Sequence, residues 1–128
     1  MPQALIVDDS KVMREMVIAC LRAHEGLSFV HAASGLEALE KLSLQRFDVV
    51  VLDLNMPDIG GYEVIEFIRG QDKLQHLPIL VVTTRGDEGS RARALAAGAN
   101  SFMTKPFQPA TLLGEVRALI GARPGAVA

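Results

Sequence analysis

The feature that most constrains the fold of this chain is a fivefold alternation of short apolar runs with longer amphipathic stretches. The apolar runs have the length of β-strands, and the stretches between them carry apolar residues at helical spacing. Such alternation favours an α/β fold, in which helices cover both faces of a parallel sheet through right-handed crossovers. A chain of 128 residues has room for one such domain. The five expected strands are 3–7, 28–33, 49–52, 78–84 and 100–104.

The intervening stretches predict helices, and apolar spacing predicts which side of each helix is buried. The first helix is expected to bury the stripe Met13, Met16, Val17, Cys20 and Leu21. The second begins at Ser34, which forms a capping box with Glu37. Its expected buried face is Leu36, Leu39 and Leu42. The third helix follows Gly60-Gly61, the fourth runs from about 87 to 97, and Pro109 suits the first turn of the last.

Composition and charge exclude several classes of protein. The chain is 49% hydrophobic and 22% charged, which is typical of a globular domain. Its net charge of −2 offers no electrostatic footprint for nucleic acid or an anionic membrane, so neither is an expected partner. Asp8 and Asp9 interrupt any signal-peptide core, and no apolar run is long enough to span a membrane. The single Cys20 is consistent with a reducing compartment, so the expected location is cytoplasmic.

Polar side chains stand at the carboxyl ends of four of the expected strands. Asp8 and Asp9 follow the first strand and Asp53 follows the third. Thr83 lies near the end of the fourth strand, and Lys105 follows the fifth. The carboxyl ends of parallel strands meet at one edge of the sheet, where open α/β folds bind their ligands. These five side chains are therefore expected to form one site.

Three carboxylates and one lysine leave an excess of negative charge at this edge. A divalent cation would compensate for it, and carboxylate, carbonyl and water oxygens are hard ligands suited to Mg²⁺ or Mn²⁺. No nearby cluster of His or Cys residues offers a zinc site instead. Carboxylates also act as nucleophiles in phosphoryl transfer, where a metal ion and a lysine neutralise charge. The pattern predicts that Asp53 accepts a phosphoryl group, with Lys105 and the Thr83 hydroxyl as donors to it.

Five segments of the sequence resemble the receiver domain of two-component response regulators, in the same order and at the same separations. They are LIVDDSKVMREMV, VVVLDLNMPDIGGYEVI, PILVVTT, AGANSFMTKPF and the final amphipathic helix. The resemblance covers roughly residues 3–121 and is closest to short stand-alone receivers of the chemotaxis type. It implies a flavodoxin-like receiver fold with a five-stranded parallel sheet of order 2-1-3-4-5. It also implies a receiver domain at 1–121 and a C-terminal tail at 122–128.

The resemblance implies a function as well. The chain would be a response regulator, a phosphoacceptor switch whose only chemistry is its own phosphorylation and dephosphorylation, and not a conventional enzyme. A histidine kinase or a histidine phosphotransfer protein would supply the phosphoryl group from a phosphohistidine. The face formed by the fourth helix, the fifth strand and the last helix would then bind a downstream protein target. Short receivers often serve chemotaxis, although cell-cycle and stress relays use them too.

The same resemblance assigns the residues of a metal and acceptor site. Asp9 and Asp53 would hold Mg²⁺ directly, and Asp8 would act mainly through water. The backbone carbonyl of Asn55 would be a further ligand. Lys105 would pair with the phosphoryl group on Asp53.

Other residues receive switching and tuning roles. Thr83 would move toward the phosphoryl group, and Phe102 would turn inward to fill the space that it leaves. An aromatic residue on an edge strand also packs for structural reasons alone, so that alternative stays open for Phe102. The Lys105–Pro106 peptide would be cis. Asn55 and Arg85, two positions after the acceptor and the switch threonine, would tune the rate of dephosphorylation.

Rival functions remain open on the sequence alone. The chain could be a receiver fragment of a longer response regulator or hybrid kinase, although the ending GARPGAVA favours a stand-alone receiver. It could also be an aspartyl-phosphate phosphatase of the haloacid-dehalogenase type. Such enzymes use a second acid two residues after the nucleophile, where this chain has Asn55, and they usually need a cap domain. A dinucleotide carrier is disfavoured, because no Gly-x-Gly-x-x-Gly follows a strand.

Overall fold

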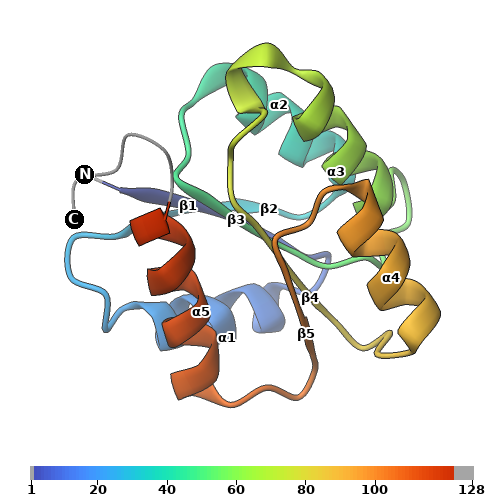
Figure 1. Ribbon diagram of the computed structural model, residues 1–128. Coiled ribbons are helices and arrows are strands. Elements are labelled where there is room, and N and C mark those ends of the chain that lie inside the picture. The colour runs from blue at the N-terminus through green and yellow to red at the C-terminus, as the bar shows by residue number, and fades with distance from the viewer. Residues whose placement is uncertain (1, 123–128) are drawn as a thin grey trace.

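The computed structural model describes residues 2–122 and shows five parallel strands in one sheet, in the order β2-β1-β3-β4-β5 (Figure 1). The strands are β1 (Gln3–Val7), β2 (Ser28–Ala32), β3 (Val49–Leu52), β4 (Ile79–Thr83) and β5 (Ser101–Thr104). The helices are α1 (Lys11–Leu21), α2 (Gly35–Leu44), α3 (Gly61–Gly70), α4 (Glu88–Ala97), α5 (Pro109–Ala122) and the short 3₁₀ helix η1 (Asp72–Leu74). The predicted fold class and strand order are confirmed. The expected tail, 122–128, lies outside the described residues except for Ala122, which ends α5.

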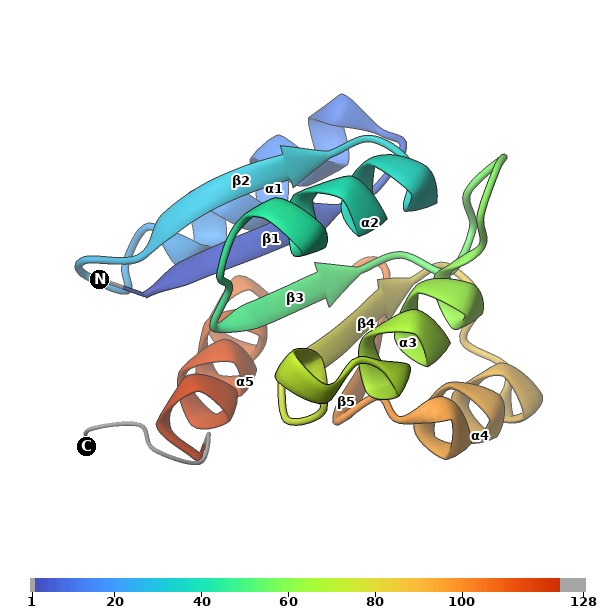
Figure 2. The same cartoon turned by 90° about the horizontal axis from the view of Figure 1, so that it is seen from above.

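Helices cover both faces of the sheet, as Figure 1 shows, with α1 and α5 on one face and α2, α3 and α4 on the other. Two hydrophobic clusters occupy the two sides. The central strands β3 and β4 are buried at every position, which accounts for their unbroken apolar runs. Seen from above, strands β2, β3 and β4 point the same way, so their carboxyl ends lie at one edge (Figure 2). Within residues 2–122, no helix is both long enough and apolar enough to cross a bilayer.

The buried face of α1 differs from the predicted stripe. Arg14 is buried with Val17, Ile18 and Leu21, whereas Met16 is 49% exposed. The helix is rotated relative to the prediction because the Arg14 guanidinium finds hydrogen-bond acceptors at the end of the sheet. The predicted stripe did not include Arg14.

The buried face of α2 also differs from the prediction, because Leu36 is 53% exposed while Gly35, Ala38 and Leu42 are buried. The helix begins against the loop that follows β3, and a Cβ on Gly35 would lie 2.1 Å from the Ile59 carbonyl oxygen. Only the smallest residue permits this approach. Ser34 caps the helix as predicted, since its hydroxyl accepts a hydrogen bond from the Glu37 N–H.

Arg69 on α3 ties the start of β4 to the end of α4. Its guanidinium donates to the carbonyl oxygens of Gly98 at 3.0 Å and Leu77 at 2.8 Å, and to the Asn100 side chain at 2.9 Å. It makes no ion pair within residues 2–122, so carbonyl dipoles alone compensate for its charge. Burial of the guanidinium lowers the pKa of Arg69 from its ordinary value.

Arg69→Met is expected to lower the free energy of unfolding by about 3 kcal/mol, because it leaves several partly buried carbonyl groups without donors. Methionine keeps the aliphatic part of the side chain, so the loss reports the hydrogen bonds. Urea denaturation followed by circular dichroism measures it. Arg117→Met is the matched control, since the exposed Arg117 guanidinium makes one hydrogen bond within residues 2–122, to the Ala23 carbonyl. Equal losses in the two variants would contradict the anchoring role.

Candidate functional site

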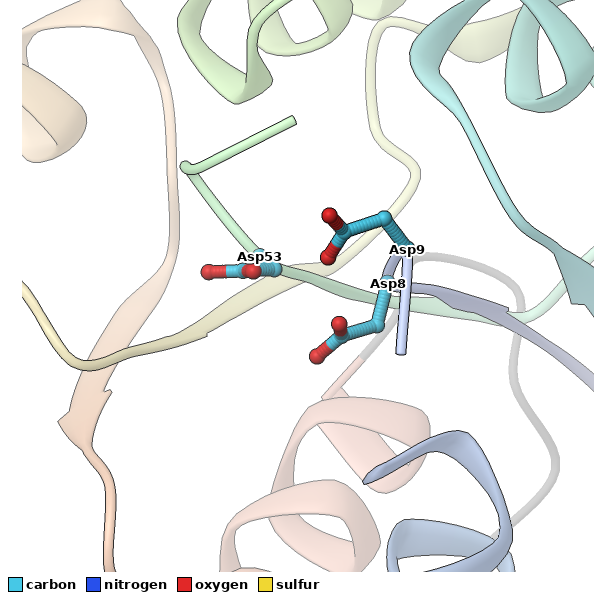
Figure 3. A group of neighbouring side chains, drawn as sticks. All are labelled: Asp8, Asp9 and Asp53. Carbon is cyan, nitrogen blue, oxygen red and sulfur yellow. The ribbon is translucent and has the colours of Figure 1, made fainter. Parts of the chain in front are cut away.

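Three carboxylates meet at the carboxyl ends of β1 and β3. The two strands are paired with Val7 opposite Leu52, so the residues that follow, Asp8 and Asp53, emerge side by side. The Asp53 N–H continues the ladder by donating to the Val7 carbonyl at 3.0 Å. One carboxylate oxygen from each of Asp8, Asp9 and Asp53 lies within 4.8 Å of the others. Figure 3 shows the three carboxyl groups directed to the same side of the strand ends.

The glycine pair after Asp53 lets the chain turn back over β3. The Gly61 N–H donates to the Leu54 carbonyl at 3.2 Å, and a Cβ on Gly61 would lie 2.6 Å from the Asp53 carbonyl oxygen. Any larger residue at 61 would displace the backbone that carries Asp53. The glycine is therefore part of what positions the acid.

Lys105 reaches the cluster from the loop after β5. Its ammonium nitrogen lies 2.6 Å from Asp8 Oδ2 and 3.7 Å from Asp53 Oδ2, and its side chain is almost as buried as those of the two acids. The Lys105 N–H donates to the Thr83 carbonyl at 2.9 Å, which fixes the loop against β4. The Lys105–Pro106 peptide is cis, as the resemblance implies.

The electrostatics of the cluster disfavour a charge on Asp53. Burial is the largest effect and raises the pKa of Asp53 above its ordinary value, and the neighbouring Asp8 adds to the rise. Lys105 acts in the opposite direction, and so does the Asn55 N–H, which donates to Asp53 Oδ1 at 3.3 Å. Among residues 2–122, Lys105 is the one cation within 4.0 Å of any of the three carboxylates, so the cluster holds more acids than cations.

The cluster has the donor set that a hard divalent cation needs, because all of its ligand atoms are carboxylate oxygens. Asp8 and Asp53 are buried, whereas Asp9 is exposed and makes no hydrogen bond or ion pair within residues 2–122. Because Asp9 is exposed, an ion from the solvent can reach the cluster from the Asp9 side. The three acids could therefore hold a metal.

The residues assigned to switching and tuning surround this cluster. Thr83 is fully buried at the end of β4, and its hydroxyl accepts a hydrogen bond from the Arg85 N–H at 3.2 Å. Asn55 lies in the loop after β3 and Arg85 in the loop after β4, and both are exposed. The Asn55 amide donates to the Thr84 hydroxyl at 3.4 Å, which links the loops after β3 and β4.

Phe102 lies apart from the acids, in the middle of β5 opposite Val81. It is partly buried and packs against the hydrophobic cluster on the α3 and α4 side. It also lines a shallow hollow with Arg91 and Phe107, between α4 and the start of α5. Both the packing and the switching interpretation of Phe102 are compatible with this place.

Three residues near the site were not predicted. Asp58, in the loop after Asp53, accepts hydrogen bonds from the Gly35 and Leu36 N–H groups and so caps α2. The Leu36 N–H is the main reason that the pKa of Asp58 is lowered. Arg14 donates to the Asp8 carbonyl, and His31 on β2 accepts from Arg14. The signal for Arg14 was its spacing, three and seven residues before the buried Val17 and Leu21.

An open parallel sheet with an acidic, lysine-paired cluster at its carboxyl edge defines a receiver-type domain of two-component signalling. The model of the response regulator receiver domain family matches residues 4–117, and the chain belongs to that family. Chemotaxis protein CheY-3 of Vibrio cholerae is 40% identical over 108 residues, which are 84% of this chain and 83% of the relative.

Solved structures of response regulators and receiver domains are also similar to this chain. Chemotaxis response regulator CheY4 of Vibrio cholerae has a TM-score of 0.85 at 38% identity, covering 93% of this chain and 98% of that chain. The receiver domain of sensor histidine kinase PA1611 from Pseudomonas aeruginosa, with a magnesium ion coordinated in its active site cleft, has a TM-score of 0.85 at 30% identity. That alignment covers 94% of this chain and 98% of the other.

Proposed function

We propose that this chain is a phosphoacceptor switch in which Asp53 receives a phosphoryl group from the phosphohistidine of a histidine kinase or a histidine phosphotransfer protein. The observation that carries the proposal is the convergence of Asp8, Asp9 and Asp53 within 4.8 Å, with Lys105 against two of them. An Asp held by a rigid buried strand, next to a lysine and an open acidic site, is arranged for charge-assisted phosphoryl transfer.

Asp53 acts as the nucleophile. A carboxylate oxygen of Asp53 forms a bond to phosphorus, the bond between phosphorus and the partner's imidazole nitrogen breaks, and that nitrogen keeps the electron pair. Lys105 is already within 3.7 Å of Asp53 and becomes the cationic partner of the phosphoryl oxygens. Asp9, Asp53 and the Asn55 carbonyl would hold Mg²⁺, or Mn²⁺ in its place, with Asp8 acting mainly through water. When bound, the ion neutralises phosphoryl charge.

The phosphoryl group then acts through local charge on the surface formed by α4, β5 and α5. The Thr83 hydroxyl moves from the Arg85 N–H toward the new oxygens, and Phe102 turns further into the space beside β4. The added negative charge biases a two-state equilibrium of that surface, which binds a downstream protein. Asn55 and Arg85 are both exposed, two positions after Asp53 and Thr83, and would set the access of water to the acyl phosphate.

Chemotaxis is the pathway that the relatives favour, because CheY-3 and CheY4 of Vibrio cholerae are both chemotaxis proteins. The similarity to the receiver of a sensor histidine kinase keeps the second possibility, that residues 1–121 act as one domain of a longer regulator. The chemistry at Asp53 is the same in both.

Phosphorylation by acetyl phosphate tests the proposal. With Mg²⁺ present, mass spectrometry of the intact protein is expected to show one phosphoryl group per chain, and an excess of EDTA is expected to abolish it. A phosphatase of the same fold would instead release inorganic phosphate through many turnovers. Phosphorylation that proceeds equally in EDTA would contradict the metal-dependent reaction.

A further inference from the structure

A buried cation outside the acidic cluster contacts the backbone that carries two of its acids. Arg14 on α1 is 9% exposed and makes no ion pair within residues 2–122. Its Nη1 donates to the Asp8 carbonyl oxygen at 2.6 Å, and its Nε donates to His31 Nδ1 on β2 at 3.0 Å. The phosphoacceptor chemistry proposed above makes no use of either residue.

The contact falls at the peptide that joins the two acids. The Asp8 side chain is held independently, because Oδ1 accepts from the Ser10 N–H at 2.9 Å and Oδ2 accepts from Lys105 at 2.6 Å. The Asp9 side chain makes no hydrogen bond within residues 2–122. Its position therefore depends on the plane of the Asp8–Asp9 peptide, and Arg14 holds the carbonyl oxygen of that peptide.

We propose that Arg14, oriented by His31, is a positioning residue that places Asp9 for binding of a divalent cation. The inference rests on the proposed function, since it takes Asp8 and Asp9 as metal-binding residues. A guanidinium is planar and donates along fixed directions, so the acceptor at Nε sets the direction in which Nη1 points. Groups that orient metal ligands in this way contribute strongly to metal affinity.

His31 is the accessible end of this arrangement and allows a test that spares the core. Arg14 has no acceptor atom, so the hydrogen bond requires a free lone pair on His31 Nδ1. A glutamine at position 31 can supply an acceptor oxygen, whereas a leucine of similar size cannot. The His31 side chain is exposed, so neither substitution removes buried packing.

The experiment compares wild type with Arg14→Met, His31→Leu and His31→Gln, and uses His76→Leu, an exposed histidine in the loop before β4, as the control. Thermal unfolding followed by circular dichroism at increasing MgCl₂ gives an apparent Kd for Mg²⁺, because a ligand of the folded state raises the Tm. Arg14→Met is expected to raise this Kd by about tenfold or more. His31→Leu is expected to raise it by about three- to tenfold, as the loss of one charge-assisted hydrogen bond implies. His31→Gln and His76→Leu should stay close to wild type.

A second readout separates positioning from general stability. The rate of phosphorylation by acetyl phosphate is expected to reach nearly the wild-type maximum in His31→Leu once Mg²⁺ saturates. A His31→Leu protein that binds Mg²⁺ with the wild-type Kd would overturn the inference, even if its Tm without Mg²⁺ is lower than that of wild type. If wild type itself shows no dependence on Mg²⁺, the proposed function fails and the inference fails with it. If wild type binds Mg²⁺ and all the variants bind it with the same Kd, the inference fails while the proposed function stands.

Discussion

Asp53→Asn is expected to abolish phosphoryl transfer, with a loss of roughly a thousandfold or more, as in enzymes that lose their nucleophile. The amide has no anionic oxygen to attack phosphorus, while its size and the backbone hydrogen bond to Val7 are unchanged. Transfer of labelled phosphate from a panel of phosphorylated histidine kinases, with wild type and variant side by side, measures the loss. Equal labelling of the two proteins would exclude Asp53 as the acceptor.

The same substitution is expected to make the unphosphorylated protein more stable at neutral pH. Burial and the neighbouring Asp8 raise the folded-state pKa of Asp53 above its unfolded value, against the opposing effect of Lys105. A group with a raised pKa favours folding fully below the unfolded pKa, and that contribution is lost as the pH rises through the folded pKa. At pH 7 the charged Asp53 therefore opposes folding. Asparagine removes this cost, so the free energy of unfolding is expected to rise by about 1 kcal/mol.

The pH dependence identifies the cause of that gain. The difference between Asp53→Asn and wild type is expected to shrink as the pH falls and Asp53 takes up a proton, which urea denaturation at several pH values can measure. Asp72→Asn, at an exposed position in η1, is the control and should show little difference at any pH. A variant that is less stable than wild type at pH 7 would show that Lys105 outweighs burial.

The acidic site could be predicted from sequence because it lies at strand ends. Strands β1 and β3 have the expected ends at Val7 and Leu52, and parallel pairing then brings Asp8 and Asp53 together whatever the details of the loops. Helix faces are less well specified. The stripe on α1 was placed one position away from its true centre, because apolar spacing gives no weight to a buried arginine such as Arg14.

Contacts between distant loops could not be predicted for a different reason. Asp58 caps α2 from 22 and 23 residues away, through the Leu36 and Gly35 N–H groups, and no local pattern records such a partner. His31 is similar, because an exposed histidine on an edge strand carries no signal until Arg14 is known to face it. The roles of these residues can be identified only once the fold shows which distant residues they contact.

Lys105→Met is expected to lower the free energy of unfolding at pH 7 by about 3 kcal/mol, since removing one partner of a buried ion pair leaves the other uncompensated. Lys105 is the only cation within 4.0 Å of the Asp8 and Asp53 carboxylates among residues 2–122. The exposed pair of Lys11 and Glu15, at 3.9 Å, is the matched comparison. Lys11→Met is expected to lower the free energy of unfolding by less than about 1 kcal/mol.

The dependence of this loss on pH distinguishes charge from packing. Lys105 is the main group that holds the pKa of Asp53 down, so its removal raises that pKa further. The destabilisation should therefore be largest at neutral pH and should decrease as the pH falls and Asp53 takes up a proton. Asp8→Asn in the Lys105→Met background removes one of the facing charges and is expected to restore most of the stability at pH 7. A loss that is constant with pH, and unchanged by Asp8→Asn, would mean that the lysine contributes its aliphatic chain and not its charge.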